Sequence, residues 1–315
     1  MATPPGPASP RSSFHVVLAM LAMVAIPAAL TLHTVRIPAI VDSTVANPSP
    51  YGYSVSLLLF LIPIVVIGLW FLPQEGVHLS RKAFGITIGL LFPIGALMDF
   101  FFANTFFTFG NAAATLGVRA PALGGGVPLE EYLFYLTGFV ACLLLYIWFD
   151  EYWLAAYSVR SDAPERTNFS RLLRFHPASL LWAIALIAAA IAYRRLFVAE
   201  AGFPAYFVFL TVAALGPSAA LLPSALPVIN WRALSLTLFF LLLTSLLWEA
   251  TLGVPYRWWG FQPTRMIGLT ITAWDNLPIE EVVVWIAVTY ATVILYETIR
   301  SWKASGRSLR HAFLN

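Results

Sequence analysis

Long apolar runs, separated by short polar segments, follow one another along the whole chain. Runs of about 18 or more residues with few charges are typical of transmembrane helices. We predict eight such spans, at residues 14–33, 53–72, 83–103, 128–149, 178–198, 204–222, 232–252 and 278–300. The pattern therefore predicts an all-α polytopic membrane protein with about eight transmembrane helices.

Three polar segments interrupt or flank the apolar runs. We expect residues 1–13 to form a disordered tail, residues 151–177 a polar linker and residues 301–315 a basic tail. If the N-terminus lies inside, 12 of the 18 Lys and Arg residues fall in the tails and loops of the inner face. Because positively charged loops stay on the cytoplasmic side, we predict a multi-pass protein of the cell membrane with both termini in the cytoplasm.

Composition narrows the chemistry that the chain can support. Hydrophobic residues make up 60% and charged residues 10%, whereas about a quarter of a soluble domain is charged. The single cysteine, Cys142, lies inside an apolar run, and the five histidines are scattered without metal-ligand spacing. We therefore expect no metal, no cofactor and no nucleic-acid partner, and we assign the net charge of +3 to membrane orientation.

Two short segments resemble each other across the chain. "PLEE" at residues 128–131 and "PIEE" at residues 278–281 both place paired glutamates before an apolar run. An offset of 150 residues aligns the two segments without a gap. The same offset brings further residues into register, namely Asp99 with Glu249, Gly110 with Gly260 and Tyr146 with Tyr296.

Chance rarely aligns acids, a glycine and a proline together, so we interpret the pattern as an internal duplication. The first repeat covers residues 14–150, with its core at 83–150, and the second covers residues 178–300, with its core at 232–300. Four spans in each repeat give the two copies the same orientation in the membrane, whereas three spans would invert one of them.

The paired glutamates each stand at the start of a predicted helix. Proline suits the first helical turn and the helix dipole favours acids there, so a surface helix cap explains either pair taken alone. Ionisable groups inside a membrane bundle are costly, however, and are functional candidates. Asp99 and Glu249 end the preceding spans on the same side, so we expect six acids near one face. These candidate catalytic residues are Glu131, Glu281, Glu130, Glu280, Asp99 and Glu249.

Helical periodicity separates the two members of each pair, because adjacent residues point about 100° apart. Glu131 and Glu281 share a face with aromatic residues, and we expect them to face a cavity. Glu130 and Glu280 share a face with small residues, and we expect them to anchor the loops. Tyr146 and Tyr296 lie about 22 Å further along their helices, at 1.5 Å per residue, where we expect interfacial anchoring.

Aromatic residues accompany these acids, in the loops between the paired helices and beside the glutamates. A buried carboxyl favours its neutral form and can donate a proton, while a second carboxylate nearby accepts one. Ring faces stabilise a neighbouring cation, so the combination suits protonation of an apolar alkene, although any single ring also fits an interfacial belt. The candidate substrate-binding residues are Phe106, Phe109, Tyr135, Tyr256, Trp258, Trp259 and Trp285.

Three features follow one another in each repeat. They are an acid that ends a span, an aromatic-glycine segment ("FFTFG" at 106–110, "YRWWGF" at 256–261) and then "PLEE" or "PIEE". With this order of motifs the chain resembles the integral-membrane lycopene cyclases of fungi and bacteria, which are built from two small homologous domains. The resemblance covers about residues 83–150 and 232–300. It implies a cofactor-free, redox-neutral cyclisation of the ψ-end groups of lycopene to β-ionone rings, through γ-carotene to β-carotene.

The resemblance also assigns roles. Glu130, Glu131, Glu280 and Glu281 become the acid and base candidates, with Asp99 and Glu249 in support. The implied partners are an apolar carotenoid substrate, lycopene, and the lipid bilayer that supplies it. Association with other enzymes of carotenoid synthesis, or with a second copy of the chain, stays open.

Other functions fit parts of the pattern. A proton-coupled transporter also repeats helices with intramembrane acids, but here the spans are not visibly broken at matching positions and the acids lie near one face. A membrane prenyltransferase would need spaced aspartate clusters for Mg²⁺ and diphosphate, which the chain lacks. A cyclase that acts on a longer carotenoid or makes an ε-ring remains an alternative.

Overall fold

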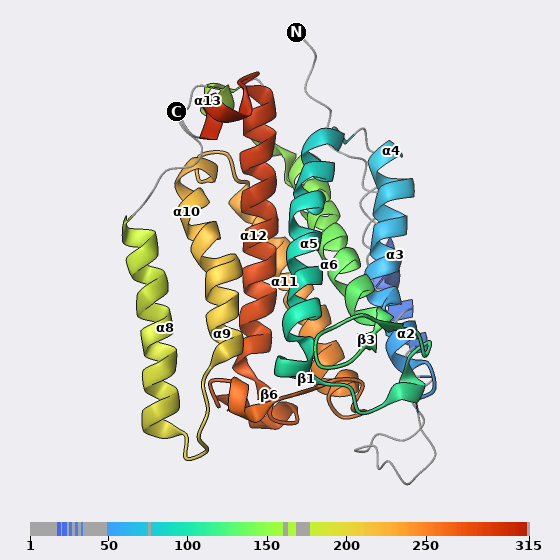
Figure 1. The fold of residues 1–315 in the computed structure, drawn as a ribbon. Coiled ribbons are helices and arrows are strands. Elements are labelled where there is room, and N and C mark those ends of the chain that lie inside the picture. Colours follow the sequence, from blue (N-terminus) through green and yellow to red (C-terminus); the bar gives the residue numbers. More distant parts are fainter. Residues whose placement is uncertain are drawn as a thin grey trace.

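The computed structural model describes residues 49–74, 77–159, 163–167 and 177–313, with scattered residues between 18 and 33. Long helices lie side by side in it, and loops join them at both ends (Figure 1). Within the described part, seven helices are long and apolar enough to cross a membrane, namely Gly52–Phe71, Arg81–Phe106, Leu129–Trp153, Pro177–Phe197, Ala205–Ala225, Trp231–Gly253 and Ile279–Ala304.

These seven helices confirm seven of the eight predicted spans to within a few residues. The remaining one, at residues 14–33, lies almost wholly outside the described residues, as does the predicted tail at 1–13. Length and composition thus support a polytopic membrane protein.

Four of the spans contain a short π-helical turn. The first consists of α2 (Gly52–Ser56), α3 (Leu58–Val66) and the turn η1 (Ile67–Phe71), followed by α4 (Leu72–Gln74). The others, in chain order, are α5 (Arg81–Phe106); α6 (Leu129–Trp148) with η3 (Phe149–Trp153); α8 (Pro177–Phe197); α9 (Ala205–Leu210), η5 (Thr211–Leu215) and α10 (Gly216–Ala225); α11 (Trp231–Trp248) with η6 (Glu249–Gly253); and α12 (Ile279–Ala304).

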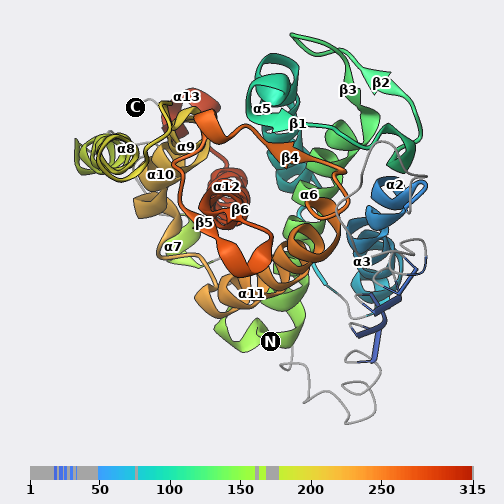
Figure 2. The ribbon, with the colours of Figure 1, turned by 90° about the horizontal axis from the view of Figure 1, so that it is seen from below.

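Helices α5, α6, α11 and α12 form the centre of the bundle (Figure 2). Helix α6 packs against α5 and α11, and α12 packs against the same two helices. Helix α3 covers α6 on one side, and α10 covers α12 on the other. Each of the two glutamate-bearing helices is therefore covered by one flanking helix. Helix α8 lies outermost, with most of its side chains exposed.

The loops at one end of the bundle contain three short antiparallel strand pairs. Strand β1 (Phe107–Thr108) pairs with β4 (Gly260–Phe261), so Phe107 lies opposite Phe261. The other two pairs are β2 (Arg119–Ala120) with β3 (Val127–Pro128), and β5 (Thr270–Ile271) with β6 (Leu277–Pro278). Short single-turn helices η2 (Ala112–Ala114), η7 (Pro263–Arg265) and η8 (Thr272–Trp274) complete these loops.

Backbone contacts in the two loop regions match at an offset of 150 or 151 residues. Leu129 N donates to Val118 O at 2.9 Å, and Ile279 N donates to Leu269 O at 3.0 Å. Pro128 and Pro278 both precede their helices in extended conformation, with ψ of 140° and 141°. Each proline therefore occupies the N-cap position, one residue before the first helical turn in which we expected it.

The loops also exchange matched contacts with each other. Gln262 N donates to Phe106 O at 2.8 Å. The amide group of Asn111 donates to Tyr256 O at 3.1 Å. The aromatic-glycine segments of the sequence therefore join the two halves of the chain at this end of the bundle.

Buried ion pairs join the halves at the opposite end. Arg300 Nη1 lies 3.1 Å from Asp150 Oδ2, and Arg166 pairs with Glu297. Arg166 belongs to α7 (Pro164–Thr167), a short helix inside the predicted linker, which also contains η4 (Ala155–Tyr157). The described part of that linker is consequently docked on the bundle, because Arg166 is fully buried.

Two expectations about this end are corrected. Tyr146 and Tyr296 are fully buried, and Tyr146 donates a 3.0 Å hydrogen bond to Glu297, so interfacial anchoring is wrong for both. Helix α12 continues to Ala304 and is followed by α13 (Leu309–Phe313), so helix replaces the first residues of the predicted basic tail. The tyrosines face inward because α6 and α12 are packed against each other in the centre of the bundle.

Candidate functional site

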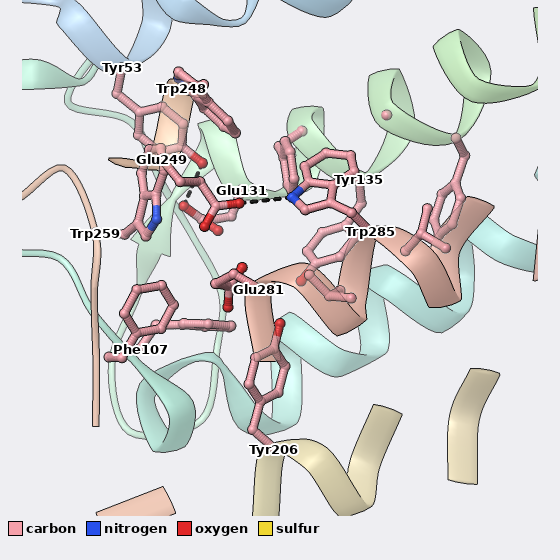
Figure 3. A pocket seen from close by; sticks show the side chains of 16 residues that line it. Tyr53, Phe107, Glu131, Tyr135, Tyr206, Trp248, Glu249, Trp259, Glu281 and Trp285 are labelled. Carbon is pink, nitrogen blue, oxygen red and sulfur yellow. Dashed lines mark hydrogen bonds between the residues drawn. The ribbon is translucent and has the colours of Figure 1, made fainter. Parts of the chain in front are cut away.

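A cavity of about 60 Å³ lies inside the bundle near the loop end that carries the strand pairs (Figure 3). Helices from both halves of the chain form its walls. Three carboxyl side chains reach it, from α6, from the start of η6 and from α12. The lining residues are Tyr53, Phe107, Glu131, Phe134, Tyr135, Gly138, Phe139, Tyr206, Trp248, Glu249, Trp259, Phe261, Glu281, Val284, Trp285 and Val288.

Glu131 lies in the first turn of α6 and is held from the neighbouring helix α2. The hydroxyl of Tyr53 donates a 2.6 Å hydrogen bond to Glu131 Oε1 (Figure 3). Both side chains are buried, with 7% of Glu131 and 1% of Tyr53 exposed. The bond fixes one oxygen of the carboxyl group against the cavity wall.

Glu281 occupies the matching position in the first turn of α12. It lies close to Glu249, whose Oε1 accepts a 2.8 Å hydrogen bond from Trp285 Nε1. The Tyr206 hydroxyl on α9 points at Glu281 from the other side (Figure 3). A tyrosine on the flanking helix therefore faces the second glutamate of the pair in both halves.

Glu130 and Glu280 point away from the cavity, into the loops. Glu130 Oε1 accepts hydrogen bonds from Leu116 N at 2.7 Å and from the Ser54 hydroxyl at 2.5 Å. Glu280 Oε1 accepts one from Ile267 N. The division that helical periodicity predicts is confirmed, since one member of each pair faces the cavity and the other holds a loop.

Asp99 is buried in the last turns of α5 and does not line the cavity. The charge of Glu131 acts on Asp99, so the two groups are electrostatic neighbours. Neither of its carboxyl oxygens has a hydrogen-bond partner among the described residues. All six candidate acids are thus buried close to one end of the bundle, and the alternative of a surface helix cap is wrong.

The predicted substrate-binding residues divide into two groups. Tyr135, Trp259 and Trp285 line the cavity. The remaining four, Phe106, Phe109, Tyr256 and Trp258, do not line it and pack in the surrounding loops.

The contacts of two of these four residues explain why they lie outside the cavity. The ring of Phe106 packs against Tyr206 at 5.1 Å between centroids, and the indole of Trp258 donates to Ser49 at 2.9 Å. The first contact joins the end of α5 to α9, and the second fixes the loop that carries Trp258. Aromatic character alone did not distinguish a loop support from a cavity wall.

Several cavity residues were missed from the sequence. Tyr53 and Tyr206 are the most informative, because each begins a span that precedes a glutamate pair. Trp248, Phe134 and Phe139 were also missed, together with the branched residues at 284 and 288. The sequence did contain one sign of these two tyrosines. Each lies near the first turn of a comparable span, and the two positions are 153 residues apart.

Aromatic rings enclose the carboxyl groups closely. Trp248 and Trp259 lie 4.5 Å apart between ring centroids, and Phe134 contacts the edge of Trp285 at 5.5 Å. No Lys, Arg or His is among the described residues that line the cavity. The described residues also contain no group of three His, Cys, Asp or Glu side chains placed to hold a metal ion.

This arrangement can perform proton transfer in apolar surroundings. Buried carboxyl groups supply and remove protons, and ring faces attract a cation that forms between them.

No protein-family model, curated protein or solved structure matches the chain.

Proposed function

We propose that the protein is a lycopene β-cyclase of the cell membrane, which converts the ψ-end groups of lycopene into β-ionone rings. The observation that supports this proposal is the convergence of Glu131, Glu249 and Glu281 on one aromatic-walled cavity. An acid-catalysed cyclisation of a hydrocarbon needs a proton donor, a proton acceptor and a wall that stabilises a carbocation. The cavity supplies all three from side chains.

The reaction is an isomerisation in which atoms and electrons balance. A carboxyl proton adds to the terminal carbon–carbon double bond of the end group and leaves a tertiary cation. A second double bond attacks this cation, so a six-membered ring closes and the positive charge moves onto a ring carbon. A carboxylate then removes a proton from the neighbouring ring carbon, which forms the ring double bond. One proton is added and one is lost.

Hydrogen bonding suggests how the carboxyl groups divide these roles. Glu249 and Glu281 lie close together at the cavity, and two neighbouring carboxyl groups favour sharing one proton because like charges repel each other. We assign proton donation to this pair. Glu131 accepts a hydrogen bond from Tyr53, which suits a proton acceptor. Asp99, behind Glu131, supports that side of the cavity.

Rings around the carboxyl groups suit the cationic intermediate. Trp248, Trp259 and Trp285 line the cavity together with Tyr53 and Tyr135. A cation within about 6 Å of an aromatic face gains roughly 0.5–2 kcal/mol, with the larger value in desolvated surroundings. Several rings acting on one buried cation would lower the barrier for ring closure.

The proposal includes the internal duplication. Helices α5 and α6 correspond to α11 and α12, the loop contacts repeat at an offset of 150 or 151 residues, and the flanking tyrosines also correspond. Both copies point in the same direction, since both glutamate pairs lie at the same end of the bundle. Each repeat contributes one cavity-facing glutamate, so we propose one shared reaction site built by both halves.

Expression in a lycopene-accumulating bacterium tests the function. The extracted pigments are separated by chromatography, and cells without the gene are the control. We expect γ-carotene and β-carotene at the expense of lycopene. An ε-ring product would redirect the proposal to another cyclase, and unchanged lycopene with folded protein in the membrane would overturn it.

A further inference from the structure

We infer that an apolar crevice beside the cavity holds the part of the polyene chain next to the reacting end group and opens to the lipid between α5 and α9–α10. The inference rests on the proposed function and adds a binding subsite to it. The crevice encloses about 60 Å³. Its walls include Leu91, Met98, Phe209 and Leu210.

Size requires a second subsite. The acid cavity has a volume of about 60 Å³, whereas pockets that enclose drug-sized ligands occupy roughly 300–1,000 Å³. Such a cavity is too small for a whole long hydrocarbon and encloses part of one end at most. The remainder of the molecule must leave the cavity through an apolar opening.

The crevice is continuous with the acid cavity. Five residues line both spaces, namely Tyr135, Phe139, Tyr206, Val284 and Val288. Two further spaces among the described residues, one between α3 and α11 and one along α8, α10 and α12, share no lining residue with the acid cavity. Continuity therefore selects the crevice as the route.

The walls of the crevice suit a linear hydrocarbon. Apart from the Tyr135 and Tyr206 rings at its inner end, all of its lining side chains are aliphatic, aromatic or thioether groups. Ala213, Ala214 and Ala291 keep the space between η5 and α12 open because their side chains are small. At the outer end, Ile94 is 45% exposed and Val212, beside the lining, is 62% exposed.

Gly95 controls the junction between the two spaces. A Cβ atom at this position would lie 2.8 Å from the Tyr135 ring, so only glycine allows that ring to rest against α5. Any larger residue would displace the Tyr135 ring, which lines both spaces. The close contact between the Gly95 backbone and the Tyr135 ring therefore determines the shape of the junction.

Narrowing the crevice tests the inference. Ala214→Phe and Ala291→Phe place a ring in the path, and Ala188→Phe is the matched control because Ala188 is exposed on the outer helix α8. Each variant is expressed in lycopene-accumulating cells, and its amount in the membrane is measured. We expect both crevice variants to lower lycopene conversion at least about tenfold, since a filled site resists extra volume. The control should convert lycopene as the unchanged protein does.

The amount of lycopene that stays bound to the purified protein can be measured without any catalytic turnover. Glu281→Gln protein is purified in detergent from the same cells, with and without Ala214→Phe, and the lycopene that remains bound is measured by its visible absorbance. We expect Ala214→Phe to lower the bound lycopene per protein, and Ala188→Phe to leave it unchanged. Ala214→Leu replaces the phenylalanine variant if the latter does not accumulate.

The outcomes separate the two proposals. If the unchanged protein retains lycopene through the crevice without converting it, the cyclase function fails and the binding subsite stands. If the protein converts lycopene and both crevice variants convert and retain it fully, the subsite is overturned and the function stands. If the protein neither converts nor retains lycopene, both proposals are wrong.

Discussion

Tyr53 donates a 2.6 Å hydrogen bond to Glu131, from helix α2, which ends at Ser56, more than seventy residues before the glutamate's own helix begins at Leu129. On the other side of the cavity, Tyr206 points at Glu281 (Figure 3). Each flanking helix therefore orients one cavity-facing carboxyl group. The two tyrosines play matching parts in the two halves of the chain, and both flanking helices contribute to the cavity wall.

Replacement of Tyr53 by phenylalanine should impair turnover more than folding. The ring remains packed, while Glu131 loses its donor, and a buried polar group left unpaired costs about 1–3 kcal/mol. We expect roughly a tenfold lower kcat, since about 1.4 kcal/mol corresponds to tenfold, with little change in KM. Tyr51→Phe, on an exposed side chain two residues away, is the control. Equal effects of the two changes would contradict a role for the hydroxyl.

Glutamine at position 131 or 281 should remove most of the activity. The amide has nearly the same shape but neither donates nor accepts the catalytic proton, and acid–base groups contribute about 10²–10⁴-fold. We expect at least about a hundredfold loss of lycopene conversion for Glu131→Gln and for Glu281→Gln. Product is measured per amount of membrane protein.

Glu200→Gln supplies the control for these two variants, because Glu200 lies in a loop at the same end with 56% of its side chain exposed. It should convert lycopene normally. Full activity in both cavity variants would show that neither carboxyl group transfers the proton.

Sequence reasoning found the helices and the acids because both leave direct patterns. Apolar runs of membrane length predicted the seven described spans. Periodicity within "PLEE" and "PIEE" predicted that Glu131 and Glu281 face inward while Glu130 and Glu280 hold the loops, and the hydrogen bonds of Glu130 and Glu280 confirm this. Local geometry was enough for these features.

Features that depend on contacts between distant helices were not predictable in the same way. Tyr53 and Tyr206 enter the cavity because α2 and α9 pack beside the glutamate helices, which no local pattern encodes. Tyr146 was expected at the membrane interface, yet it is buried against Glu297. An amphipathic ring fits either environment, and only the packing of α6 on α12 decides between them.

A chain cut between the two halves should still assemble. The halves are joined by the β1–β4 pair at one end and by the Arg300–Asp150 and Arg166–Glu297 ion pairs at the other. We expect co-expressed fragments, cut between residues 167 and 177, to convert lycopene, and either fragment alone to convert none because the cavity needs Glu131 and Glu281 together. Pigment chromatography measures the outcome. Activity of a single fragment would contradict the shared site.

Arg300→Met should destabilise the bundle without altering the reaction. Arg300 contacts Asp150, Glu151 and Glu297 at the end away from the cavity, and its side chain is only 9% exposed. Removing one partner of a buried ion pair costs about 3–5 kcal/mol because the remaining carboxylates are left uncompensated. We expect a clearly lower unfolding temperature in detergent, with activity per folded protein unchanged at low temperature.

Lys303→Met is the matched control for this change. Lys303 lies on the same helix, three residues further on, with an exposed side chain that rests over the Trp302 ring. A surface cation contributes little to stability, about 0–1 kcal/mol, so this variant should unfold near the temperature of the unchanged protein. If Arg300→Met instead lowered activity at full stability, the distant ion network would be coupled to the cavity through α12, and its purely structural role would be wrong.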